Sequence, residues 1–337
     1  MVGAQQVRLR CRAVSATSRT FRLPTFSSAR GRAPSLGEGI LLGLCSLAAL
    51  ITVAVIVEVV YQLITGAHLA VGKLGLAFLL HQSWAPNFDR FGAAVLLFGT
   101  VVSSFMALAL AVPIGVSIGL YLSLLAGGRV RAIVGPLVEL VAAVPTVILG
   151  LWGILVLSPF VHSVLEPALH GALGFIPLFG TPESNGAGVF TAGLILTIMV
   201  VPIVAALSRD LFLTVPRELQ EGASALGATR WEVIRGVILP ATAPGVIAAS
   251  VLGLGRALGE AIAVTQVIGA GTVIHASLFK TGDTLASRLA ENFPGDHPLY
   301  TSSLFYVALV LLVLGITVNL LAQYIGRRFD TRRVRRT

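Results

Sequence analysis

Long apolar runs separated by short charged segments dominate this chain. Six runs are long enough to cross the hydrocarbon core of a bilayer as helices, which takes about 20 residues each. They cover residues 39–65, 92–122, 133–157, 187–213, 243–271 and 302–326. The longest runs allow for a tilted helix or a turn at the membrane surface. The pattern therefore predicts an all-α polytopic membrane protein with six transmembrane helices in one domain, residues 38–326.

The composition agrees with a membrane protein. Hydrophobic residues make up 55% of the chain, charged residues only 12%, and the mean hydropathy is +0.90, which is unlike a soluble domain of this length. Two basic segments flank the domain, and we expect both to be tails, at residues 1–37 and 327–337. Arginines beside spans also explain the net charge of +9 as topology signals and contacts for anionic membrane lipid, without a nucleic-acid partner.

The distribution of Lys and Arg predicts how the chain crosses the membrane. All but five of the 24 lie in the two tails, in the loop at 123–132 or in the loop at 208–242. The five are Lys73, Arg90, Arg256, Lys280 and Arg288. Arg256 is inside an apolar run, and the other four lie in loops on the opposite side. The positive-inside rule then places both termini and the 208–242 loop in the cytoplasm.

Few residues suggest chemistry of their own. The two cysteines, Cys11 and Cys45, fall in the N-terminal tail and the first run, so we expect no disulfide framework. Histidines are scattered, and no cluster has the spacing of a metal site, so we expect no metal and no cofactor. The only two lysines do not follow the glycine spacing of a nucleotide-binding loop. The chain is therefore expected not to be an enzyme.

A polar loop at 214–242 contains the signals of two short helices. Pro216 suits the first turn of a helix, and Gly227 suits its C-terminal end. Thr229 and Glu232 then have the spacing of a capping box, which starts a second helix. Two short helices around a glycine make a compact knob suited to a groove on a partner.

Two opposite charges lie inside the fifth run. Arg256 and Glu260 are one helical turn apart, so we expect them to pair. Gly255 and Gly259 repeat this spacing on an adjoining face, where we expect a neighbouring helix to approach closely. Two interpretations stay open. Either the pair only holds helices together, or it lines an anion path in which Glu260 weakens the grip of Arg256. A guanidinium suits a tetrahedral oxyanion.

The polar loop carries a resemblance to a known family. Its residues follow the spacing of the E-A-A-x-x-x-G-x9-I-x-L-P loop, with Gly222 in place of the second Ala and Val237 in place of the Ile. The chain therefore resembles the membrane subunits of binding-protein-dependent ABC importers. This resemblance implies that the loop docks on a separate ATPase. The residues it assigns to docking are Glu221, Gly222, Ala223, Gly227, Leu239 and Pro240.

A second motif narrows the resemblance. GRALGEAIAV at 255–264 is similar to the G-R-A-L-G-E-T-M-A-V signature of the PstC-type permease of phosphate-specific importers, with Ala261 and Ile262 as departures. W-A-P at 84–86 and VPTVILGLWG at 144–153 also match, in the same order. The resemblance implies a type I ABC importer (MetI-like) permease core of five helices plus an N-terminal helix, multi-pass in a bacterial inner membrane.

The same resemblance implies partners and a substrate. The partners are a PstA-type second permease subunit, a dimer of ABC ATPase subunits, and a periplasmic or lipid-anchored phosphate-binding protein. The chain would then carry inorganic phosphate while the partner hydrolyses ATP. Alternatives that stay open are a permease for another oxyanion such as molybdate or sulfate, an ion-coupled secondary carrier, and a membrane partner that senses phosphate. Pro113, Pro145 and Pro202 lie within predicted spans and act either as hinges or as static kinks.

Overall fold

The structure is a computed structural model, which describes the backbone of residues 36–183 and 185–334 and the side chains of 37–183 and 185–324. The described residues form helices, with a single isolated bridge between Ala85 and Arg90. The α-helices are α1 (Leu36–Leu74), α2 (Ala94–Leu120), α3 (Gly128–Ala143), α4 (Thr146–Trp152), α5 (Ser158–Phe160), α6 (Glu166–Leu173), α7 (Val189–Leu213), α8 (Arg217–Ala225), α9 (Arg230–Val233), α10 (Leu239–Gly259), α11 (Ile262–Ile268), α12 (Leu285–Asn292) and α13 (Pro298–Val334). Short 3-10 or π-helical turns are η1 (Gly75–Leu79), η2 (Pro86–Phe88), η3 (Tyr121–Leu125), η4 (Gly153–Leu157), η5 (Val161–Leu165), η6 (Pro177–Phe179) and η7 (Ile234–Ile238).

The chain divides into two compact units, Met1–Val57 and Glu58–Thr337. The described part of the first unit is the N-terminal half of α1, where apolar residues follow one another on all sides of the helix. A helix that is apolar all round suits a lipid environment. Cys45 is exposed on this helix. Of the predicted tail at 1–37, the last two residues belong to α1, whereas residues 1–35, with Cys11, lie outside the described residues.

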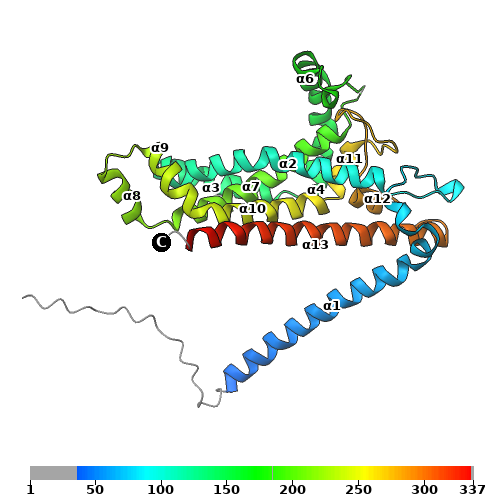
Figure 1. The fold of residues 1–337 in the computed structure, drawn as a ribbon, viewed down its shortest axis with the longest axis horizontal. Helices are drawn as coiled ribbons and strands as arrows, with labels where there is room; N and C mark the ends of the chain where they lie inside the picture. Colours follow the sequence, from blue (N-terminus) through cyan, green and yellow to red (C-terminus); the bar gives the residue numbers. More distant parts are fainter. Residues whose placement is uncertain (1–35, 184, 335–337) are drawn as a thin grey trace, which may run out of the picture. The chain divides into compact units, whose positions relative to one another are not determined.

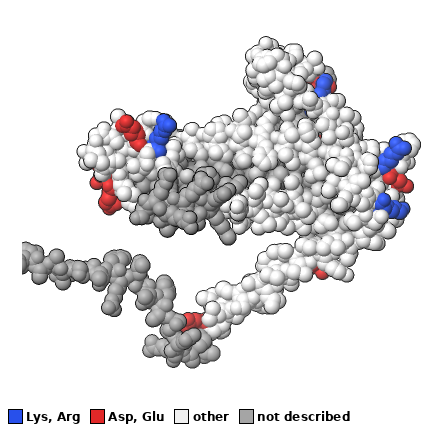
Figure 2. Space-filling view, viewed as in Figure 1, with Lys and Arg blue, Asp and Glu red and all other residues white. Residues whose placement is uncertain are grey.

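The second unit is built around α2, α7, α10 and α13, which run along one another (Figure 1). Its largest core joins α2, α7 and α11 with η4 and η5 through residues such as Val200, Val204 and Val267. On the face shown in Figure 2, the charged side chains of the bundle helices lie at the two ends of the bundle and beside α6, and the described surface between them is uncharged. A long uncharged belt between charged ends is the surface that a bilayer requires.

Helices α2 and α7 form the closest pair in the bundle because small residues face each other. A Cβ atom at Gly119 would lie 3.0 Å from the carbonyl oxygen of Ala205, and one at Gly115 would lie 2.9 Å from Cβ of Val204. Glycine at both positions therefore lets the two backbones approach more closely than any larger residue would permit. Pro113 and Pro202 lie inside these uninterrupted helices.

Six helices are long and apolar enough to cross a membrane, which confirms the predicted number. They are Gly37–Leu79, Ala94–Leu125, Thr146–Leu173, Val189–Leu213, Arg230–Gly259 and Pro298–Tyr324. The chain is therefore an all-α, multi-pass membrane protein. The helix α13 continues beyond the predicted end of the last span at 326 to Val334, and nothing beyond that residue is described.

The predicted bounds of the third span, 133–157, were wrong. Helix α3 ends at Ala143 and α4 begins at Thr146, so a break falls in the middle of this apolar run. Pro145 explains the break, since it has no N–H to donate and disfavours helical backbone at the residue before it. The backbone of Val144 is accordingly extended. Figure 1 shows α3 along the bundle and α6 directed away from it.

Candidate functional site

A groove of about 860 Å³ runs between α10 and α13, with one residue of α7 at its edge. Its walls are mostly aliphatic residues, glycine and alanine. The polar side chains that line it, as far as the chain is described, are Arg256 from α10, and Asn319 and Gln323 from α13. The groove therefore presents one cation and two amides within helices that are long and apolar enough to cross a membrane.

Arg256 is exposed in this groove, near the C-terminal end of α10. The sequence VLGLGRAL is apolar on every side of the helix except at Arg256. Leu254, Ala257 and Leu258 are buried on the face of α10 that packs in the bundle, while Arg256 lies on the exposed face. No ion pair joins Arg256 to any acidic residue in the described part of the chain. The guanidinium is therefore available to a ligand or to another chain.

The predicted pair of Arg256 and Glu260 is not formed, and that prediction was wrong. Helix α10 ends at Gly259, and the backbone of Glu260 is extended, with φ −73° and ψ 117°. One helical turn brings two side chains together only if the helix continues through both. Instead, Oε1 of Glu260 accepts a long hydrogen bond of 3.4 Å from the backbone N–H of Ala263, at the start of α11. The fifth predicted run, 243–271, is thus two helices with a break at Glu260.

The expected close packing at Gly255 and Gly259 is also absent from the described chain. No atom lies within 4 Å of a Cβ placed on either glycine. Gly255 borders the groove of Arg256, and Gly259 borders a second hollow of about 420 Å³ beside α12. Both glycines therefore face open space where another helix was expected.

The polar loop has the predicted two-helix form. Helix α8 ends at Ala225, and Gly227 follows with a φ of +89°, a left-handed conformation that favours glycine. The capping box is present at α9: the Oγ1 of Thr229 accepts from the N–H of Glu232, and the Glu232 carboxylate accepts from the N–H of Thr229.

The outer surface of this loop is apolar as well as charged. Leu226 is 92% exposed, and Leu219 and Trp231 are more than half exposed. Glu221 and Gly222 are exposed beside them on α8. Apolar side chains clustered on a charged loop are a feature of interaction surfaces.

The remaining residues that were assigned to docking lie on the inner side of the loop. Ala223 and Leu239 pack against a small core formed by Phe212, Val233 and Ile238 with their neighbours. Pro240 is the second residue of α10 and directly follows the helical turn η7, so the continuous helix lacks one N–H donor at this point. The helical path from α9 through η7 into α10 is nevertheless continuous, from Arg230 to Gly259.

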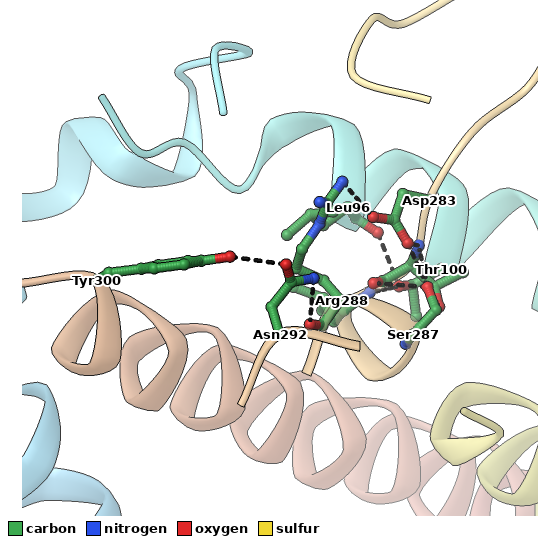
Figure 3. Close-up of polar contacts among 9 residues, drawn as sticks. Leu96, Thr100, Asp283, Ser287, Arg288, Asn292 and Tyr300 are labelled. Atoms are coloured by element: carbon green, nitrogen blue, oxygen red, sulfur yellow. Dashed lines mark hydrogen bonds and ion pairs between the residues drawn. The ribbon is translucent and has the colours of Figure 1, made fainter. Parts of the chain in front are cut away.

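A buried polar cluster that the sequence did not reveal lies where α12 meets α2 (Figure 3). The Nη2 of Arg288 lies 2.5 Å from Oδ2 of Asp283, with exposed side-chain fractions of 10% and 1%. Ser287 donates a hydrogen bond to the other carboxylate oxygen. Thr100 of α2 accepts from the N–H of Leu285 at 2.9 Å. These contacts fasten the start of α12 to the bundle.

Two further interactions complete this cluster. The guanidinium of Arg288 lies 5.4 Å from the ring centroid of Trp84, within the range of a cation–π contact. Burial raises the pKa of the Asp283 carboxyl above its ordinary value, and the charge of Arg288 opposes that rise. Sequence reasoning counted Arg288 only as a charge in a loop, because Asp283 and Trp84 are brought to it by folding alone.

A second buried acid lies on α6, outside the groove. Glu166 is 1% exposed, and it accepts a hydrogen bond of 3.1 Å from the backbone N–H of Glu183. Glu183 in turn pairs with Lys280, with Nζ and Oε2 2.9 Å apart. These contacts tie α6 to the segments that flank α7 and α11, and they supply no open polar site.

The six membrane-crossing helices, the broken fifth span and the cation-lined groove define a membrane permease. The chain belongs to the family described as binding-protein-dependent transport system inner membrane component, whose family model matches residues 111–331. Members of this family are transport subunits and not enzymes, and they work in systems that depend on a binding protein.

Named relatives of this chain are also transport permeases. The chain is 38% identical over 292 residues to a phosphate transport system permease protein PstC of Mesorhizobium japonicum, covering 85% of this chain and 88% of that protein. It is 42% identical over 241 residues to a phosphate transport system permease protein PstC 2 of Mycobacterium bovis, covering 70% and 74%.

A solved structure supports the fold. The chain resembles one from a bacterial alginate ABC transporter in complex with a periplasmic protein, with a TM-score of 0.58 and 16% identity, covering 85% of this chain and 94% of that chain. At this identity the likeness shows the fold alone. It agrees with the expected type I ABC importer (MetI-like) permease core.

Proposed function

We propose that this chain is the translocation subunit of an ATP-driven importer of inorganic phosphate. The observation that carries the substrate is the 38% identity, along 85% of the chain, to a permease named for phosphate transport. The groove supports it, because its one charged side chain, Arg256, has the charge and shape that bind a phosphate oxyanion.

Arg256 is the principal residue of the phosphate path in this proposal. A cation inside an apolar membrane helix is costly, so a membrane helix retains one where it has a use. In the groove, aliphatic walls reduce the screening of its charge. No carboxylate of the described chain neutralises it, so the full charge faces the path.

Glu260 has a positioning role in the same site. Its carboxylate accepts from the first turn of α11, and its extended backbone ends α10 one turn beyond Arg256. Broken helices of this kind are common where a transporter holds its substrate, because a break is tolerated where it lines a cavity. Glu260 therefore fixes where α10 stops, without neutralising the cation.

The loop from α8 to α9 is the ATPase-docking element. Glu221, Gly222 and Gly227 occupy its exposed surface, and Leu226 and Trp231 add apolar contact area. Leu239 and Pro240 lie at the beginning of α10 and connect this surface to the membrane helix. A dimer of ABC ATPase subunits would then receive one such loop from this chain and one from a PstA-type second permease.

The proposed orientation places the α8–α9 end of the bundle and both termini in the cytoplasm. Arg217 and Arg230 begin the two loop helices, and positive residues beside spans favour that side. The end with α6 and α12 would then face a periplasmic or lipid-anchored phosphate-binding protein. Membrane lipid covers the uncharged belt of the bundle.

Uptake by the complete complex in liposomes tests this function. The complex of both permeases, the ATPase and the binding protein should accumulate labelled phosphate only with ATP on the ATPase side. Molybdate and sulfate in excess should leave that uptake unchanged. Uptake of molybdate or sulfate in place of phosphate would assign another oxyanion. Uptake that follows an ion gradient without ATP would make the chain a secondary carrier and refute the proposal.

A further inference from the structure

The wall of the groove opposite Arg256 carries two amides that the proposed function does not yet use. Asn319 and Gln323 lie one turn apart on α13 and both line the groove. The Nε2 of Gln323 donates to Oδ1 of Asn319 at 3.4 Å. That is the only hydrogen bond that either amide makes among the described residues. Both amide groups of α13 therefore keep N–H donors that have no partner among the described side chains, 37–183 and 185–324.

Unsatisfied amides are costly in a membrane helix. A polar group without a hydrogen-bond partner costs several kcal/mol in hydrocarbon, by order of magnitude. The neighbours of the amides on the same wall are Gly315, Val318 and Ala322, which offer no side-chain acceptor. The amides are therefore stable in this place only if water, an anion or another chain supplies the acceptor.

Charge complementarity identifies the acceptor. Among the described residues that line the groove, the one charged group is the cation of Arg256, which attracts anions and repels cations. An amide pair in which Gln323 donates to Asn319 leaves the Nδ2 donors of Asn319 free, and donating chains of this kind polarise one another. Both walls thus offer N–H donors to the charged oxygens of a phosphate anion.

We infer that Asn319 and Gln323 form the second wall of the anion path and bind phosphate from the side opposite Arg256. This inference rests on the proposed function, and it adds residues of α13 that neither motif contains. A hydrogen bond to a charged group contributes about 1.5–3 kcal/mol, which corresponds to about a 10- to 100-fold change in binding. Their loss should therefore appear mainly as a higher KM for phosphate.

The first experiment measures phosphate uptake by the reconstituted complex, divided by the amount of assembled complex. Asn319→Leu with Gln323→Met keeps size and removes the amides, and uptake at low phosphate should fall at least about tenfold. The matched control is Thr317→Val on the same helix. Thr317 does not line the groove, and its hydroxyl donates to the carbonyl of Val313 at 2.7 Å. Its variant should transport normally.

The outcomes separate this inference from the proposed function. If wild type and the control take up phosphate and the amide variant equals them, the second wall is wrong while the function stands. If wild type takes up no phosphate, the proposed function fails first. If the amide variant no longer assembles with the second permease, the amides bind a partner helix, and the inference is overturned.

A second measurement does not depend on activity. With Cys11 and Cys45 replaced by serine, Asn319→Cys should react with a charged, membrane-impermeant thiol reagent in the whole complex, because a thiolate forms only where water enters. Phosphate should slow that reaction. Thr317→Cys should react at least about tenfold more slowly, as expected for a thiol facing lipid. Equal reactivity of the two variants, or no protection by phosphate, would overturn the inference.

Discussion

The buried pair of Asp283 and Arg288 offers the sharpest test of how this fold is held together. Both side chains are almost fully buried, and their charged atoms are 2.5 Å apart. Removing one partner leaves an uncompensated charge, which costs about 3–5 kcal/mol in buried pairs. We therefore expect Arg288→Met and Asp283→Asn each to lower the stability of the subunit by about that amount.

A double variant measures the interaction between Asp283 and Arg288 apart from the contacts that each makes with other residues. Asp283→Asn with Arg288→Met removes both charges together, so it should be more stable than the worse single variant. It still loses the cation–π contact with Trp84, which is worth about 2 kcal/mol when desolvated. A double-mutant cycle should then give a coupling energy of about 2–3 kcal/mol.

The pH dependence of the stability loss gives a second, independent test of this pair. Burial raises the pKa of Asp283 in the folded state, and Arg288→Met removes the charge that opposes this rise. A carboxyl with a raised folded pKa binds its proton more tightly when folded, so acidification favours the folded state. The stability lost by Arg288→Met should therefore shrink as the pH falls from neutral toward the ordinary pKa of a carboxyl, because the proton then neutralises the uncompensated charge. The loss in Asp283→Asn, which has no carboxyl at 283, should not shrink.

Thermal unfolding of the purified subunit in detergent, followed by tryptophan fluorescence, measures these effects. Arg90→Met is the matched control, since Arg90 is exposed and makes no side-chain ion pair in the described chain. It should unfold like the wild type. Single variants at 283 and 288 that unfold at the wild-type temperature would refute this account of the cluster, as would a double variant no more stable than both singles.

Three further predictions concern the proposed site. Gly227→Val should uncouple ATPase binding and uptake, because a β-branched residue at φ +89° is strained by about 1–3 kcal/mol and would misplace α9. Gly236→Ala in η7, which has open space around it and is not assigned to docking, should co-purify with the ATPase normally. Arg256→Gln should lower phosphate uptake by about 10- to 100-fold at unchanged assembly. Glu260→Gln keeps an oxygen that accepts from Ala263 and should lower uptake less than Glu260→Ala does; equal losses in these two would contradict the positioning role.

Hydrophobic runs were sufficient to predict the number and type of the spans, because the bilayer imposes one length on every helix that crosses it. They were insufficient at Pro145 and at Glu260, where the chain breaks inside an apolar run. Pro145 is visible in the sequence, yet Pro113 and Pro202 lie in unbroken helices. Whether a proline breaks a membrane helix depends on whether neighbouring groups satisfy the freed carbonyls, and only the fold determines that.

The sequence predicted only part of the candidate site, again because some contacts depend on how the helices fold together. Arg256 stood out because a lone cation in an apolar run is unusual, whatever its neighbours. Its pairing with Glu260 assumed a helix that continues through both residues, and the extended backbone at Glu260 ends it. The sequence did not identify Asn319 as a site residue, because an uncharged amide in a span can be assigned to the groove only once the fold places α13 beside α10. The same holds for Asp283, whose partner Arg288 meets Trp84 only in the folded chain.

The unbroken path from the polar loop to the cation connects the two halves of the proposed mechanism. From Arg230 to Gly259 the backbone is helical throughout, by way of α9, η7 and α10. At about 1.5 Å per residue such a segment spans roughly 45 Å, more than the thickness of the hydrocarbon core. A displacement of the loop by an ATPase would therefore move Arg256 with it, since the segment ends only at Glu260. Because no carboxylate of the described chain weakens the hold of Arg256 on an anion, release has to come from a change in the groove itself. In the proposed mechanism, a shift of α10 along α13 would separate Arg256 from Asn319 and Gln323, so that phosphate would lose one wall of donors when the ATPase acts.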